Sequence, residues 1–150
     1  MPQSFAHVPL HIIFSTKERQ NWILPQIEQK LFAFMGSVCN QLQCKPIIIN
    51  GVEDHVHLLV YLSRTITIAK FLEKLKVESS KWMKRQGQYY QHFSWQRGYA
   101  AFAVENIPRI KNYILGQKDH HHGTGIDFKK ELIKILNYYE IPYDERYLWD

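Results

Sequence analysis

Hydrophobic and polar positions alternate in the segment His-Val-His-Leu-Leu-Val-Tyr-Leu at residues 55–62. A short run rich in β-branched and aliphatic residues is typical of a β-strand. Because successive side chains point to opposite faces of a strand, His55 and His57 share one face. The opposite face carries Val56, Leu58 and Val60. The pattern therefore predicts a strand that buries its aliphatic face and presents two imidazoles on the other.

The same periodicities outline the rest of the chain. They predict further strands at 8–15, 46–52 and 94–104, and helices at 24–42, 67–86, 107–120 and 127–139. The strands at 46–52 and 55–62 would form a hairpin around Glu53-Asp54. The order βαββαβ, followed by added helices, is the ferredoxin-like split βαβ plan, an α+β fold with an antiparallel sheet. We expect residues 1–150 to form one such domain, with its helices on one face of the sheet and the other face free for a ligand or partner.

Composition narrows the class of partner. A chain of 150 residues with 45% hydrophobic content can build one core, and its net charge of +5 and pI near 9.2 favour an anionic partner, most often nucleic acid. Cys39 and Cys44 are the only cysteines, too few for a four-thiolate zinc site. The N-terminus lacks a signal-peptide pattern, and no apolar stretch approaches the ~20 residues of a membrane span. We expect a soluble, cytoplasmic protein.

The two histidines are the first candidate site. Burying two imidazoles side by side is unfavourable unless they have partners, and a divalent cation would bind both through neutral ring nitrogens. From these residues alone, a half-exposed pair of strand histidines explains the pattern equally well.

The helix predicted at 107–120 carries a second motif. An apolar stripe of Ile107, Ile110 and Ile114 can pack on the sheet. Tyr113 and Gln117 lie one turn apart beside this stripe, so a phenol and an amide would project from the same rim. Taken alone, a Tyr-x-x-x-Gln pair usually means a half-buried tyrosine near a polar neighbour.

Together the motifs resemble a known family, the HUH single-tyrosine transposases of the smallest bacterial insertion sequences and their REP-associated relatives. The resemblance extends over nearly the whole chain and is carried by residues 8–17, 54–60, 76–80, 93–102, 113–117 and 143–149. Gly116 departs from the pattern, because a polar residue such as Asn is expected before the Gln. Glycine lowers helix propensity by about 1 kcal/mol, so we expect a looser turn at Gln117.

The resemblance implies the same fold and a specific chemistry. His55, His57 and Gln117 would bind a labile Mg²⁺ or Mn²⁺, and Tyr113 would attack single-stranded DNA, with hairpins, to form a 5′-phosphotyrosine and release a 3′-OH. The reaction is a transesterification and needs no energy source. The resemblance also implies a homodimer in which the Tyr113 helix of one subunit docks on the His55-His57 face of the other.

Other residues have both a functional and a plain interpretation. His120 could be a fourth ligand or a phosphate contact, although a histidine at the end of a helix commonly just complements the helix dipole. Asp54 could orient His55 or only shape the turn. A DNA path could involve the basic residues Lys17, Arg19, Lys74, Lys76, Lys81, Lys84 and Arg85, although charged faces are usually only solvated. Trp95, Tyr99 and Phe102 could stack on bases, but strand aromatics are more often core residues.

Three alternatives remain at the level of sequence. A domesticated relative would use the same chemistry to process repetitive DNA hairpins. A non-catalytic RNA- or DNA-binding module on the same fold would have aromatics on the central strands, where this chain has His55 and His57. A rolling-circle or conjugation nuclease would share the histidine pair, but is usually longer and often has a third histidine in the cluster.

Overall fold

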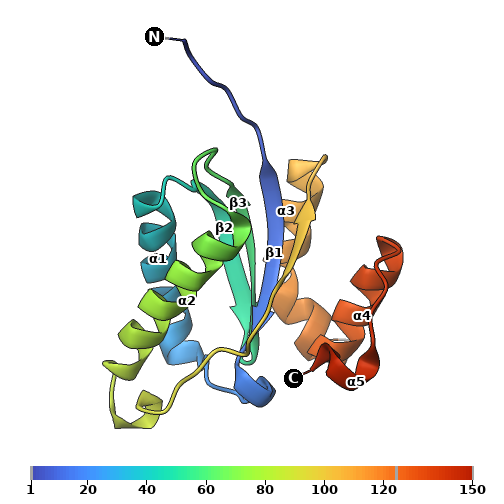
Figure 1. Cartoon of the computed structure of the whole chain (residues 1–150). Helices are drawn as coiled ribbons and strands as arrows, with labels where there is room; N and C mark the ends of the chain where they lie inside the picture. Colours follow the sequence, from blue (N-terminus) through green and yellow to red (C-terminus); the bar gives the residue numbers. More distant parts are fainter. Residues whose placement is uncertain (1, 124, 150) are drawn as a thin grey trace.

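A four-stranded antiparallel sheet forms the centre of the molecule in the computed structural model, which describes residues 2–123 and 125–149. The strands are β1 (Pro9–Ser15), β2 (Pro46–Val52), β3 (His55–Tyr61) and β4 (Ala100–Ala103), in the order β2-β3-β1-β4 (Figure 1). The predicted hairpin is confirmed, because β2 pairs with β3 up to Val52 and His55 on either side of the turn. The predicted α+β, ferredoxin-like architecture is likewise confirmed.

Helices cover both faces of this sheet (Figure 1). Helices α1 (Pro25–Gln41) and α2 (Ile68–Lys84) pack on one face, and α3 (Ile107–Leu115) and α4 (Phe128–Tyr138) pack on the other. A π-helical turn at Asp119–Gly123 lies between α3 and α4, and a short α5 (Glu145–Leu148) follows α4. The expectation of a free second face was wrong. That face also carries apolar side chains, Ile13, Leu59 and Phe102, which α3 and α4 bury.

The larger core lies between the sheet and helices α1 and α2. It receives Leu10, Ile12 and Phe14 from β1 and Val56, Leu58 and Val60 from β3. The helices contribute Leu31, Met35, Phe71 and Leu75, which are fully buried. Strict alternation along β3 thus places Val56, Leu58 and Val60 in this core and turns His55, His57 and Leu59 toward α3 and α4.

The predicted strand at 94–104 is shorter in the structure. Regular pairing with β1 is confined to β4, and only an isolated bridge between Thr16 and Trp95 precedes it. The Nζ of Lys76 donates hydrogen bonds to the carbonyl oxygens of Gln96 and Gly98, and Gly98 has a φ of 85°. Because these carbonyls accept hydrogen bonds from a side chain and the backbone turns at Gly98, residues 96–99 leave the sheet.

The helix predicted at 107–120 also differs, because regular α-helix ends at Leu115. The N–H of Gly116 lies 3.2 Å from the carbonyl oxygens of both Asn112 and Tyr113, a bifurcated pattern typical of a helix end. Helical backbone resumes after Gly116 and passes into the π-helical turn. The looser turn expected at Gly116 is therefore present. No helix in the described ranges combines the length and the apolarity required to cross a membrane.

Candidate functional site

Three histidines from two adjacent strands begin the site. His55 and His57 of β3 have no exposed surface, and His11 of β1 is 4% exposed. The Nε2 of His11 lies 2.8 Å from the Nδ1 of His57, so these two rings share one proton in a hydrogen bond. Burial lowers the pKa of His57 to about 4, and burial together with the charge of His57 lowers the pKa of His11 to about 3. Both rings are therefore neutral, the form that binds metals.

A carboxylate from α4 lies against the β3 histidines. The Oε1 of Glu131 is 3.1 Å from the Nε2 of His55 and 3.1 Å from the Nε2 of His57. It is also 3.1 Å from the Nε2 of His121 in the π-helical turn. Burial raises the pKa of Glu131, but hydrogen bonds with His121, His55 and His57 outweigh burial and hold that pKa well below its usual range. Glu131 is therefore an ionised, almost fully buried carboxylate.

Tyr113 and Gln117 bind the second oxygen of this carboxylate. The Tyr113 hydroxyl and the Nε2 of Gln117 both donate to Oε2 of Glu131, the latter over 3.1 Å. The Oε1 of Gln117 is 3.3 Å from the Nε2 of His55. Burial and the negative charge of Glu131 raise the pKa of Tyr113 well above its usual range. The predicted phenol, amide and imidazoles therefore do come together, with Glu131 between them.

Asp54 orients the first histidine of the pair. Its Oδ1 lies 2.7 Å from the Nδ1 of His55. Burial lowers the pKa of His55, but hydrogen bonds with Asp54 and Glu131 and the charges of both carboxylates raise it to about 9. A carboxylate on the outer ring nitrogen fixes the tautomer and the ring orientation, as is usual around metal-binding histidines.

Asn50 of β2 holds the end of the helix that carries Tyr113. Its Nδ2 donates to the carbonyl oxygens of Ile114, over 2.9 Å, and Leu115, over 3.4 Å. The last carbonyls of a helix have no partner within the helix, so a side-chain donor at this point stabilises the helix end. Asn50 is paired with His57 in the sheet. It thereby fixes α3 relative to the histidine strand.

The three consecutive histidines after α3 take different positions. The ring of His120 packs against that of Tyr113, with centroids 4.8 Å apart. His121 is the one that reaches Glu131, while the Nε2 of His122 lies 3.1 Å from Oε2 of Glu53. The sequence drew attention to His120 because regular helical spacing places it on the side of Tyr113. The π-helical turn changes this spacing and brings His121 to the carboxylate.

Sequence reasoning missed Glu131, His121, His11 and Asn50 as parts of the site. For Glu131 a signal existed, because it lies on the apolar stripe of α4 formed by Phe128, Leu132 and Leu136. A carboxylate on a buried helix face is rare unless it is paired. His11, Asn50 and His121 are ordinary in sequence, and only their packing reveals them.

The donor set suits a hard divalent cation. One ligand atom from each of His55, His57 and Glu131 lies within 4.8 Å of the others, and all three residues are buried. Imidazole nitrogens combined with carboxylate or amide oxygens are accepted by Mn²⁺ and Mg²⁺, whereas the described residues around this point offer no thiolate for a soft metal. The residues present therefore fit the metal that the resemblance implies.

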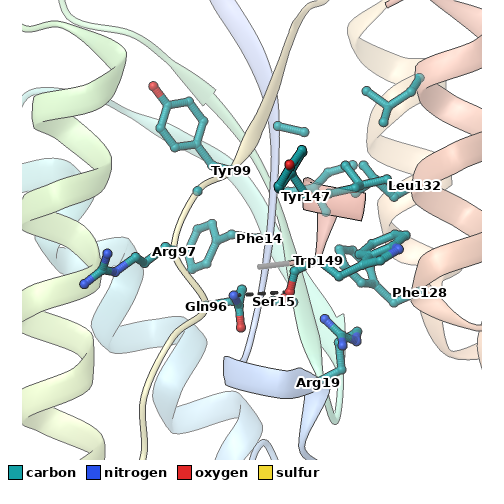
Figure 2. Close-up of a pocket in the computed structure, with 15 residues that line it drawn as sticks. Phe14, Ser15, Arg19, Gln96, Arg97, Tyr99, Phe128, Leu132, Tyr147 and Trp149 are labelled. Atoms are coloured by element: carbon teal, nitrogen blue, oxygen red, sulfur yellow. Dashed lines mark hydrogen bonds between the residues drawn. The ribbon is translucent and has the colours of Figure 1, made fainter. Parts of the chain in front are cut away.

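Two hollows flank the segment at 96–99, near the predicted DNA-contacting residues. One, of about 420 Å³, lies between β1, β4 and the C-terminal helices and is lined by Arg19, Arg97, Tyr99, Phe128 and Trp149 (Figure 2). The guanidinium of Arg19 stacks over the Trp149 ring, 5.6 Å from its centroid. The other hollow, of about 540 Å³, adjoins α2 and is lined by Lys76, Lys81 and Lys84 among others.

The remaining basic and aromatic candidates divide by exposure. Five of the basic candidates are exposed: Lys17, Lys74, Lys81, Lys84 and Arg85. Among them, Lys81 forms an ion pair with Glu78 at 4.0 Å. Lys76 is half-buried and bonded to backbone carbonyls. Trp95 and Phe102 are core residues, 7% and 4% exposed, whereas Tyr99 is 45% exposed at the rim of both hollows. Of the three aromatics, only Tyr99 is exposed.

Comparisons with known proteins agree with this picture. Residues 4–122 match the family model described as "Transposase IS200 like". The chain is 24% identical over 125 residues to the transposase for insertion sequence element IS200 of Salmonella typhimurium, covering 77% of this chain and 82% of the relative; the Salmonella typhi transposase matches equally well.

Two solved structures share the fold. The crystal structure of a protein assigned as a transposase from Deinococcus radiodurans R1 superposes with a TM-score of 0.61 at 21% identity, covering 78% of this chain and 96% of that chain. A REP-associated tyrosine transposase bound to a REP hairpin superposes with a TM-score of 0.57 at 11% identity, covering 83% of this chain and 73% of that chain. Because the family model spans most of the sequence, the chain belongs to the IS200-like transposase family.

Proposed function

We propose that this protein is a metal-dependent transposase that cleaves and rejoins single-stranded DNA through a phosphotyrosine at Tyr113. The observation that carries the proposal is the convergence of the Tyr113 hydroxyl, the Gln117 amide and the His55-His57 pair on one buried point, from two different elements. A non-catalytic binding module gives no reason to gather a half-buried phenol, a buried amide and two buried imidazoles at one point. This arrangement supports an enzyme.

The tyrosine is the nucleophile in this proposal. Its oxygen forms a bond to phosphorus on the 5′ side as the bond to the 3′ oxygen breaks, and the phenolic proton is balanced by protonation of the departing 3′ oxygen. The phosphodiester is exchanged for a phosphotyrosine of similar energy, so a 3′-OH can later reverse the step and rejoin DNA. His55, His57 and Gln117 would hold Mg²⁺ or Mn²⁺, which polarises the scissile phosphate when bound.

The proposed substrate is single-stranded DNA that contains hairpins. The net charge of +5 and the exposed lysines on α2 favour phosphate contacts. The REP hairpin bound to the related transposase supports a hairpin as the recognised feature. Mobilisation of an element and processing of repetitive hairpins by a domesticated protein use the same site, and the two are separated by the DNA that surrounds the gene.

Assembly is the remaining part of the proposal. A homodimer with the Tyr113 helix docked in trans is what the resemblance implies. Within one chain, the Tyr113 ring lies 5.9 Å from the ring of His57, so docking in cis is the alternative assembly. Exchange would require α3 to leave the hydrogen bonds of Asn50, with Gly116 and Gly125 as points of backbone freedom.

The test is covalent capture. The full chain is incubated with Mn²⁺ and single-stranded oligonucleotides that carry the hairpins flanking its gene, and a denaturing gel is examined for a protein–DNA adduct. We expect the DNA segment on the 3′ side of the cleavage site, labelled at its 3′ end, to remain on the protein through its 5′ phosphate, and the segment on the 5′ side to be released with a free 3′-OH. Binding without any adduct or cleavage in Mn²⁺ and Mg²⁺ would refute the enzymatic proposal and favour a binding module.

A further inference from the structure

Three imidazole nitrogens converge on a single carboxylate oxygen at the base of α4. The Nε2 atoms of His55, His57 and His121 each lie 3.1 Å from Oε1 of Glu131. We propose that Glu131 is itself a ligand of the divalent metal, so that a carboxylate from the helix after the tyrosine helix completes the site. This inference rests on the proposed function, because it concerns the ligands of the same metal.

The protons on these rings explain why a cation fits. The Nδ1 of His55 lies 2.7 Å from a carboxylate oxygen of Asp54, and the Nδ1 of His121 lies 2.6 Å from the carbonyl oxygen of Ile126. Both partners only accept, so each Nδ1 carries its proton. A histidine binds a metal as the neutral ring, and Nε2 then directs a lone pair toward the point that Oε1 of Glu131 also faces. A proton on Nε2 can join one ring to Oε1, whereas a divalent cation can bind all of these Lewis bases at once.

The spacing matches that of atoms sharing an ion. Adjacent ligands on an octahedron with bonds of about 2.1 Å lie about 3.0 Å apart. The distances of 3.1 Å from Oε1 to the histidine nitrogens agree with this edge length. A carboxylate also supplies the negative charge that an amide lacks, and hard cations such as Mg²⁺ and Mn²⁺ prefer it.

Gln117 and Tyr113 hold this carboxylate in position. Both donate to Oε2, which leaves Oε1 directed at the histidines. The amide nitrogen of Gln117 donates to Glu131, and its amide oxygen lies 3.3 Å from the Nε2 of His55. Gln117 can therefore orient the carboxylate and also contribute its oxygen to the metal site. One carboxylate thereby links the metal and the hydroxyl of the nucleophile.

Metal affinity tests the inference without reference to catalysis. Binding of Mn²⁺ to the full chain is measured from the electron paramagnetic resonance signal of free Mn²⁺, for the native protein and for Glu131→Gln. Loss of a direct ligand should raise the dissociation constant by at least about 10-fold. Glu28→Gln is the matched control, because Glu28 is a 9% exposed carboxylate that pairs with Lys118 at 3.1 Å outside this cluster. The Glu28→Gln protein should bind Mn²⁺ with the same dissociation constant as the native protein.

The outcomes separate this inference from the proposed function. A folded Glu131→Gln protein with native Mn²⁺ affinity overturns the inference, even if adducts still form with DNA. Mn²⁺ binding that depends on Glu131 but never leads to an adduct supports the inference and refutes the proposed function. If Glu131→Gln does not fold by circular dichroism, Glu131→Asp replaces it: the shorter carboxylate should weaken Mn²⁺ binding several-fold, and native affinity there overturns the inference.

Discussion

The hydroxyl of Tyr113 donates a hydrogen bond to Oε2 of Glu131, between side chains 18 residues apart in sequence. Burial and the negative charge of Glu131 raise the pKa of Tyr113, so the phenol keeps its proton at neutral pH in this state. The hydroxyl is thus held in place by a carboxylate and is not ionised in advance. Formation of the phosphotyrosine would then require the hydrogen bond between the Tyr113 hydroxyl and Glu131 to break when DNA binds.

Removal of one oxygen tests the nucleophile. Tyr113→Phe should abolish adduct formation and cleavage, by ~10³-fold or more, because the attacking atom is lost while the ring is kept. DNA binding should stay close to native in a gel-shift assay. Tyr99→Phe is the control, since Tyr99 is 45% exposed and lies outside the cluster, and it should form adducts normally. An adduct with Tyr113→Phe would reassign the nucleophile.

Substitution of different metal ligands should reduce DNA cleavage to different extents. His57→Ala should eliminate cleavage, because a fully buried imidazole with Nε2 in the cluster is removed. Gln117→Ala should reduce cleavage less, since an amide oxygen is a weaker donor than imidazole. Excess chelator should stop the native enzyme, and added Mn²⁺ should restore it. Strand cleavage of labelled DNA measures all three, and full activity in chelator would exclude a metal mechanism.

Mixing two inactive variants distinguishes cis from trans assembly. Tyr113→Phe and His57→Ala chains are mixed, and adducts are measured on a denaturing gel. Because α3 is tied to its own β2 by Asn50, cis sites predict that every mixed particle stays inactive. Docking in trans, which the family resemblance implies, predicts that mixed dimers regain one complete site. A sedimentation profile of the native chain shows whether dimers form at all.

Lys76 should give stability a characteristic pH dependence. Burial lowers its pKa from 10.5 to about 8, so between about pH 8 and 10.5 the unfolded chain holds more protons than the folded one. Stability from this residue therefore rises with pH across that window and is constant below it. Urea unfolding from pH 7 to 10 should show the native protein gaining stability relative to Lys76→Met.

The exposed neighbour Lys74 on the same helix provides the control. Lys74→Met should follow the native pH profile. If the free energy of unfolding of Lys76→Met runs parallel to that of the native protein over the whole range, Lys76 does not titrate as described.

Gly51 allows no side chain at the hairpin that positions His55. A Cβ there would lie 2.3 Å from the carbonyl oxygen of His55 and 3.0 Å from Cα of Val56, which are backbone atoms that cannot move aside. Gly51→Ala should lower the free energy of unfolding by about 1–3 kcal/mol. Gly36→Ala, within α1 and 4.0 Å from its nearest neighbours, should instead raise it by about 0.5–1 kcal/mol. Urea denaturation of both variants checks the contrast in sign.

Local periodicity determined much of this protein. Alternation along residues 55–61 is a property of extended backbone, so it placed His55 and His57 on one face before any packing was known. The helical spacing of Tyr113 and Gln117 depends only on the turn of a helix, and both side chains do reach the same carboxylate. Their motifs also carried the family resemblance that the family model confirms.

Tertiary structure alone decided what those residues meet. Glu131 is 76 positions from His55 in sequence, and it reaches the site only because the apolar stripe of α4 packs on the histidine face. The π-helical turn, which helical periodicity does not describe, selected His121 over His120. Such contacts between distant segments depend on the packing of whole elements and on the burial of a charge that only its partners stabilise, and no local pattern encodes either.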